Sequence, residues 1–238
     1  MNGYTGRGLH GQVVNELGAR IVSGRLGHEE SIDLGRLEVE LDISRTMLRE
    51  ALKVLAAKGL IDARQKRGTY VLPRSRWHLL DADVLRWQFS ARPTGELLGQ
   101  LAEVRAIVEP AGARLAAQRR DEQDLAALTA ALAAMAASTS DTAAAVDADL
   151  RFHRALLAAS HNELLERMAA MIEVGLAARD ALVHDGHGAP VEGPVPAHQA
   201  VFDAVHAGDP DAAEAAMRAL LDQAERDTEL LRRAEETG

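Results

Sequence analysis

The sequence predicts a mainly α-helical protein in two parts: a small N-terminal domain of three helices plus a β-hairpin, and a C-terminal all-α antiparallel helical bundle. Three observations support this prediction. Of the 238 residues, 47% are hydrophobic but only 3% are aromatic, so Ala and Leu, which favour helices, supply most of the apolar surface. Apolar residues recur at helical spacing almost throughout the chain after residue 94. Two short β-prone runs lie close together between residues 60 and 72.

Composition also limits the compartment and the chemistry. The chain has no cysteine, which excludes disulfides, thiolate metal sites and cysteine nucleophiles. No apolar run approaches the roughly 20 residues needed to cross a bilayer. The start, MNGYTGRGLHGQ, lacks the apolar core of a secretion signal. We therefore expect a cytoplasmic protein without a membrane segment.

Charge is distributed unevenly along the chain. The formal net charge is −9, yet residues 1–76 carry 13 Lys and Arg against 9 Asp and Glu. Residues 77–238 carry 14 basic against 27 acidic side chains. A basic head on an acidic body is the pattern of a nucleic-acid-binding module joined to a domain that avoids nucleic acid.

The N-terminal domain begins with three predicted helices. The first covers residues 9–24, where apolar side chains share one face. Asp33 is a suitable N-cap for a short second helix over 34–41, and Ser44 for a third helix over 45–59.

The third helix has two chemically different faces. One is a leucine stripe for the core, and the other carries Arg45, Arg49 and Lys53 at intervals of four residues, with Thr46 beside the first. Guanidinium groups can pair with guanine edges or phosphates, and Thr46 can contact a phosphate or a thymine methyl. An isolated helix of this kind would more often be an ordinary solvated surface helix.

The following stretch, LIDARQKRGTYVLP, changes that interpretation. Its β-prone runs, 60–63 and 69–72, flank a tip that contains Lys66, Arg67 and Gly68. Glycine permits a positive φ and a close backbone approach, and the two basic side chains can reach the minor groove or phosphates. Three helices followed by a basic hairpin make a winged helix-turn-helix.

These residues also resemble a known family. SRTMLREALKVLAAKGLI, followed by RGTYV, is similar to the DNA-binding domain of GntR-type regulators. The resemblance implies operator contacts from Arg45, Thr46, Arg49 and Gly68. Before the second helix the family usually has Pro-Gly and Leu-Pro, where this chain has LGHEESIDLG, and a family arginine aligns with Gly35. The operator sequence is therefore not transferable.

Domain boundaries follow from these patterns. We predict a DNA-binding domain at 1–74, a linker at 75–93 and a helical domain at 94–238. The linker holds both tryptophans of the chain, and its apolar residues from Leu79 to Phe89 suggest a short packed helix. The C-terminal domain is predicted to contain helices at 95–119, 121–138, 142–159, 162–184, 196–207 and 209–234.

Three features of the bundle could carry chemistry. Asp149 and His153, one helical turn apart, can bind one metal or polar ligand, although such a pair is commonly a surface pair. His198 begins a later helix, where a histidine by itself is more often a cap or a surface residue. Arg105 lies on an apolar stripe and needs an anion, either a ligand carboxylate or Glu109 four residues on.

A second resemblance bears on these features. EVRAIVEPAGARLAA, DLRFHRALLAASHNELL and AHQAVFDAVHAGDPDAAEAAM are similar, in order and spacing, to the FCD ligand-binding domain of the FadR subfamily. Many such domains hold a divalent metal with one Asp and three His. Asp149, His153 and His198 match three ligands, but Leu220 stands at the fourth position. The three could bind Zn²⁺ with water or effector completing the shell, or could hydrogen-bond a polyol acid directly.

The resemblance further implies how the protein works. Arg105 matches the residue that faces the effector carboxylate, and we group Asn162, a cap candidate by its position, with the effector-binding residues. RSRWHLLDADVLRW also resembles regulators of galactonate-type sugar-acid catabolism. We therefore expect a homodimeric repressor that binds an inverted repeat and is released by a small carboxylate, with a hexonate favoured. The alternatives are a metalloenzyme built on the Asp149, His153 and His198 set, and an architectural DNA-binding protein without effector.

Overall fold

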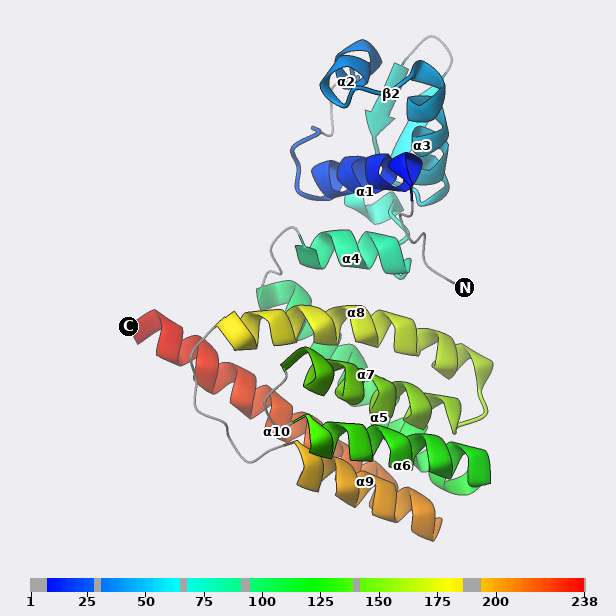
Figure 1. Ribbon diagram of the computed structural model, residues 1–238, viewed down its shortest axis with the longest axis vertical. Coiled ribbons are helices and arrows are strands. Elements are labelled where there is room, and N and C mark those ends of the chain that lie inside the picture. Colours follow the sequence, from blue (N-terminus) through cyan, green and yellow to red (C-terminus); the bar gives the residue numbers. More distant parts are fainter. Residues whose placement is uncertain are drawn as a thin grey trace. The chain divides into compact units, whose positions relative to one another are not determined.

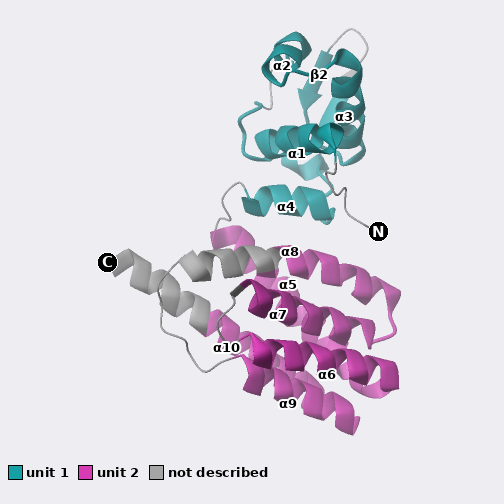
Figure 2. Cartoon of the chain, in the orientation of Figure 1, with its two compact units in different colours: residues 1–93 teal, residues 94–238 magenta. Residues whose placement is uncertain are grey.

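The computed structural model describes residues 8–27, 31–64, 68–90, 95–138, 142–185 and 194–237. The chain divides into two compact units, residues 1–93 and 94–238, coloured separately in Figure 2. Ten α-helices and one β-hairpin in the described residues confirm the mainly α fold (Figure 1). The segment predicted as a linker, residues 75–93, groups with the first unit.

The first unit contains the predicted three helices, hairpin and linker helix. Both expected N-caps are confirmed: Oδ1 of Asp33 accepts from the Arg36 amide at 3.0 Å, and Oγ of Ser44 accepts from the Met47 amide at 3.3 Å. The elements in order are α1 (Leu9–Val22), α2 (Leu34–Glu40), α3 (Arg45–Ala57), β1 (Ile61–Arg64), β2 (Gly68–Val71), a 3₁₀ turn (Arg74–Arg76) and α4 (Ala82–Ser90).

Helix α4 is fastened to the helices before it. Trp87 is 4% exposed within the core of the first unit, and its Nε1 donates to Oδ1 of Asn15 in α1 at 3.1 Å. The helix begins at Ala82, although the apolar pattern suggested a start near Leu79. The side chain of Asp81 accepts from two backbone amides of the first turn, and this cap sets the start.

A partly buried ion cluster joins the end of α3 to the start of α4. Nζ of Lys58 lies 2.8 Å from carboxylate oxygens of both Asp81 and Asp83. Arg86 contacts the other oxygen of Asp83, whose side chain is only 3% exposed. Burial alone would raise the pKa of Asp83, but its hydrogen bonds to Lys58 and Arg86 lower it. Helix α3 and the start of α4 are therefore held together.

The hairpin has a short antiparallel register from Ile61 opposite Val71 to Arg64 opposite Gly68. Gly68 has φ +86°, and a Cβ there would lie 2.4 Å from Oγ of Ser31. Only glycine meets both conditions without strain. The tip residues Lys66 and Arg67 lie outside the described residues.

The second unit is all helical, as predicted. Its helix boundaries agree with the expected ones to within a few residues, because capping residues such as Asp121 and Asn162 mark them in the sequence. The helices are α5 (Gly95–Arg119), α6 (Glu122–Ala137), α7 (Thr142–Ala158), α8 (Glu163–Asp185), α9 (Val195–Ala207) and α10 (Pro210–Thr237) (Figure 1).

Small residues let the helices of this unit approach closely. Alanines at 113, 116 and 117 of α5 are at most 1% exposed, beside the fully buried Phe152 and Leu156 of α7. A Cβ at Gly112 would lie 2.5 Å from Cδ2 of Leu157, so α5 and α7 touch there. In the parts of the chain that the structure describes, no helix is long and apolar enough to cross a membrane.

Candidate functional site

The exposed face of α3 carries the predicted basic residues. Leu48, Leu52 and Leu55 are buried, whereas Arg45, Thr46, Arg49 and Lys53 are all exposed. The spacing of four residues therefore places the cationic side chains on one solvent-facing side of a helix whose opposite side is anchored in the core. Such a helix can enter a major groove without losing its packing.

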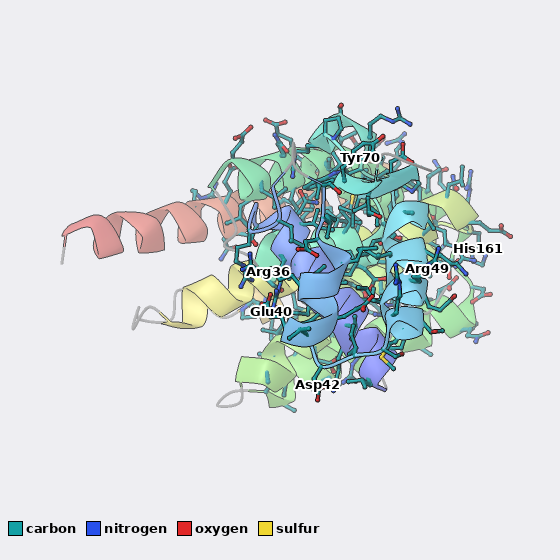
Figure 3. The ribbon with its side chains drawn as sticks, turned by 90° about the horizontal axis from the view of Figure 1, so that it is seen from above. Arg36, Glu40, Asp42, Arg49, Tyr70 and His161 are labelled. Carbon is teal, nitrogen blue, oxygen red and sulfur yellow. The ribbon has the colours of Figure 1, made fainter. Side chains whose placement is uncertain are left out.

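The basic side chains of α3 differ in how far they are already paired. Nε of Arg45 lies 3.7 Å from Glu38, and Nζ of Lys53 lies 2.7 Å from Glu50. Among the described residues, Arg49 forms no ion pair, so its guanidinium is available to a phosphate or base. Arg36 on α2, which we did not include among the predicted contacts, is likewise exposed and without an ion pair in the described ranges. Figure 3 shows Arg36 and Arg49 on these two neighbouring helices.

A cluster of polar side chains is buried inside the second unit. It joins Arg105 of α5 (6% exposed), Asp149 and His153 of α7 (His153 3% exposed) and His198 of α9 (4% exposed). Oδ1 of Asp149 lies 2.9 Å from Nε2 of His198 and 3.7 Å from Nε2 of His153. Four of the five predicted effector-binding residues are thus brought together from three helices.

Glu109 is the fifth member of this cluster. Its side chain is fully buried, with Oε1 2.5 Å from Nε of Arg105 and Oε2 2.6 Å from Nδ1 of His153. Burial alone would raise the pKa of Glu109, but the charges of His153 and Arg105 lower it to about 2. The sequence indicated the Arg105 pairing through the i, i+4 spacing, whereas the contact with α7 is visible only in the fold.

The donor set fits a divalent cation. One atom each from Asp149, His153 and His198 lies within 4.8 Å of the others, as ligands around one ion do. Nε2 of His198 is buried and has no regular hydrogen bond, although the carboxylate oxygen is near. A cation bound by both atoms would satisfy them. Leu220, at the fourth family position, is 5% exposed within the apolar core and supplies no ligand.

One predicted effector-binding residue and a second group of possible metal ligands lie outside the buried cluster. Oδ1 of Asn162 caps α8 by accepting from the Leu164 and Leu165 amides, so its effector-binding role stays a prediction. Asp121, Asp124 and His161 form a second group of candidate ligands at the surface. Capping of α6 and an ion pair between Asp124 and His161 account for this group.

Comparison with known proteins defines the class. Residues 9–71 match the family described as bacterial regulatory proteins, gntR family, and residues 100–223 match the FCD domain. The chain belongs to the GntR family of transcriptional regulators and carries an FCD domain behind its DNA-binding domain. The resemblance expected from the sequence is confirmed.

Among individual relatives, the galactonate operon transcriptional repressor of Escherichia coli K12 is 36% identical over 211 residues, 88% of this chain and 92% of the relative. The regulator LutR of Bacillus subtilis is 32% identical and covers 86% of this chain and 94% of its own. These relatives are regulators, so they support regulation of transcription over enzyme catalysis.

Solved structures confirm the fold. The Listeria monocytogenes regulator Lar has a TM-score of 0.62 at 20% identity, covering 95% of this chain and 98% of its own. Escherichia coli McbR has a TM-score of 0.56 at 18% identity, covering 96% and 99%.

Proposed function

We propose that this regulator is a homodimeric repressor of sugar-acid catabolism that binds an inverted-repeat operator and releases it when a small carboxylate, with a galactonate-like hexonate favoured, enters the second unit. The single observation that carries the proposal is the buried cluster around Asp149. An arginine, two histidines and a carboxylate in an apolar bundle match the needs of a polyhydroxy acid, whose charge pairs with a guanidinium and whose hydroxyls bind imidazole and carboxylate.

The operator side of the proposal rests on α3 and the hairpin. Arg45, Thr46, Arg49 and Lys53 would meet the major groove, and Lys66, Arg67 and Gly68 would meet the neighbouring backbone or minor groove. A dimer would present two such helices to half-sites about one helical turn apart. Effector binding would lower operator affinity through a coupling between the two sites.

A Zn²⁺ ion held by Asp149, His153 and His198 is part of the proposal. Three protein ligands leave coordination positions that water or the effector carboxylate can fill. Arg105 would then bind the rest of the acid group. Because the fourth protein ligand is replaced by Leu220, the ion would be held less tightly than by a complete set.

The test uses the full chain and DNA from its own genomic neighbourhood. We expect a gel shift at low salt that D-galactonate reverses, and calorimetric heat with D-galactonate but not with galactose, which lacks the carboxylate. Arg105→Lys keeps a charge beside Glu109 but loses the planar fork, so operator binding should persist while release fails. Normal release of the variant would remove Arg105 from the effector site. A shift that no sugar acid reverses would favour an architectural protein.

A further inference from the structure

The imidazole of His153 lies between a carboxylate and a guanidinium. Nδ1 is 2.6 Å from Oε2 of Glu109, and Nε2 is 3.4 Å from Nη2 of Arg105. A carboxylate only accepts and a guanidinium only donates. The proton of a neutral His153 therefore belongs on Nδ1, although its N–H is not well aligned with the oxygen, and the lone pair belongs on Nε2.

The second imidazole is oriented in the same way by the backbone. Nδ1 of His198 lies 2.7 Å from the carbonyl oxygen of Pro194, which can only accept. Its proton also belongs on Nδ1, and its Nε2 lies 2.9 Å from Asp149. Both histidines thus present Nε2 to one carboxylate oxygen, one of them because of Glu109.

We propose that Glu109 is a positioning residue that holds His153 in its Nδ1–H tautomer, so that the Nε2 lone pair faces Asp149 and His198. This inference deepens the proposed function, since it names the group behind the effector and metal site. A histidine that binds a metal commonly donates its other ring N–H to a carboxylate, and loss of that partner weakens metal binding by about 10- to 100-fold. Glu109 also bonds Arg105, so one carboxylate orients both side chains.

Glu109→Gln is the informative substitution. The amide oxygen can still accept from Nε of Arg105, while the amide NH₂ can donate to Nδ1 of His153. The ring would then lose its proton at Nδ1 and carry it at Nε2, which would face Asp149 and Arg105 with an N–H in place of a lone pair. The shape of the side chain is kept.

The first measurement is the imidazole nitrogen NMR spectrum of the EDTA-treated full chain with labelled histidine, at about pH 8.5, where ordinary imidazoles are neutral. His153→Gln assigns the signal. We expect the Nδ1–H tautomer for His153 in the unchanged protein and the Nε2–H tautomer in Glu109→Gln. Asp124→Asn, which removes the carboxylate beside the surface His161, is the matched control and should leave His153 unchanged.

The second measurement is calorimetric titration of the same proteins with ZnCl₂ alone, with melting temperature and operator binding as checks on folding. We expect Zn²⁺ binding to weaken about 10- to 100-fold in Glu109→Gln while operator binding persists.

An unchanged His153 tautomer and an unchanged Zn²⁺ affinity in Glu109→Gln would overturn the inference. If the unchanged protein binds no Zn²⁺, the metal proposal fails. The NMR measurement of the His153 tautomer then still tests whether Glu109 is a positioning residue. If the variant does not fold, an Nε2–H tautomer in the unchanged protein overturns the inference, and an Nδ1–H tautomer supports it.

Discussion

Two arginines with proposed ligand contacts, Arg49 and Arg105, lie in opposite environments. Arg49 is exposed on α3 and, in the part of the chain that the structure describes, has no ion-pair partner. Arg105 is 6% exposed and is held by Glu109. An exposed guanidinium adds nothing to folding and is available to a ligand from outside, whereas a buried one needs a counter-charge before any ligand arrives. The two residues are therefore tested by different measurements.

For Arg49 the measurement is operator affinity. Arg49→Ala removes a cation that faces solvent, so folding should be unaffected, while operator binding should weaken on the order of tenfold to 100-fold. A gel-shift titration at fixed salt measures this. Arg218→Ala, at an exposed arginine of the second unit, is the control and should bind the operator normally. Equal affinities of the two variants would place Arg49 outside the interface.

For Glu109 the measurement is acid stability. Its pKa of about 2 lies below the ordinary 4.5, so the folded state binds the proton more weakly than the unfolded chain. The resulting stabilisation is complete above the ordinary pKa and is lost as pH falls toward 2. We expect the Tm of the native protein to fall over this range, and Glu109→Gln to have a lower Tm at neutral pH and a shallower fall. A fall as steep in Glu109→Gln as in the native chain would contradict this assignment.

The site residues could be predicted to different degrees. Asp149 and His153 stand one helical turn apart, so the sequence shows that they share a helix face. Arg105 stands in another run with helical spacing, so the sequence shows that it lies on an apolar stripe. That His198 joins them, 45 positions after His153, came from the family resemblance. The contact of Glu109 with His153 depends on the close approach of α5 and α7, which no local pattern encodes.

At the scale of elements, α3 and α4 share one ion cluster. Lys58 is the C-cap residue of α3, and its side chain, 13% exposed, reaches Asp81 and Asp83 around the start of α4. Its backbone oxygen also accepts from the His78 amide at 3.0 Å. Helix α3, which would read DNA, and helix α4 are therefore held together within the first unit.

Lys58→Met should destabilise the first unit. The thioether fills a similar volume but leaves Asp81 and Asp83 close together, with Asp83 buried and only Arg86 to pair with it. We expect a loss of roughly 2–3 kcal/mol in the free energy of unfolding, measured with urea, because breaking a buried pair strands a charge. Lys53→Met on the same helix breaks only an exposed pair and should leave the unfolding free energy nearly unchanged. Equal losses in the two variants would refute a special role for the cluster.

Element boundaries were predictable where a polar side chain marks them. Asp33, Ser44 and Asn162 cap helices as their positions suggested, and the structure adds Asp121 as the cap of α6. The start of α4 was placed too early, because Leu79 and Leu80 continue the apolar pattern. The cap at Asp81 begins the helix, and Leu80 remains 76% exposed. Hydrophobic spacing indicates which residues face a core, whereas the first-turn hydrogen bonds decide where a helix begins.

At the scale of the whole molecule, the two parts of the chain differ in the sign of their charge. The basic excess lies in residues 1–76 and the acidic excess in the remainder of the chain. Repulsion of DNA by the acidic part would confine operator contact to the N-terminal unit. This division was readable from the sequence alone, because it requires only a count of charges along the chain.

Salt dependence tests this charge separation together with the proposed dimer. If a homodimer neutralises roughly 6–8 phosphates, log K should fall against log salt with a slope on the order of −6. Fluorescence anisotropy with a labelled operator measures the slope, and sedimentation measures the protein-to-DNA ratio. A slope half as steep with one chain per whole operator would contradict a dimeric complex. Arg49→Ala should reduce the slope by about two, one unit for each chain.

The contact of Gly112 with Leu157 has a consequence for genetics. The glycine lies three residues after Glu109 and faces no polar group, yet it sets how near α5 comes to α7. A methyl group there would displace the buried Leu157 side chain, one turn after His153 on α7, and disturb the link from Glu109 to His153, while the first unit would keep its fold. We expect bacteria that carry Gly112→Ala to keep the regulated genes switched off when effector is present. The variant regulator should still occupy the promoter.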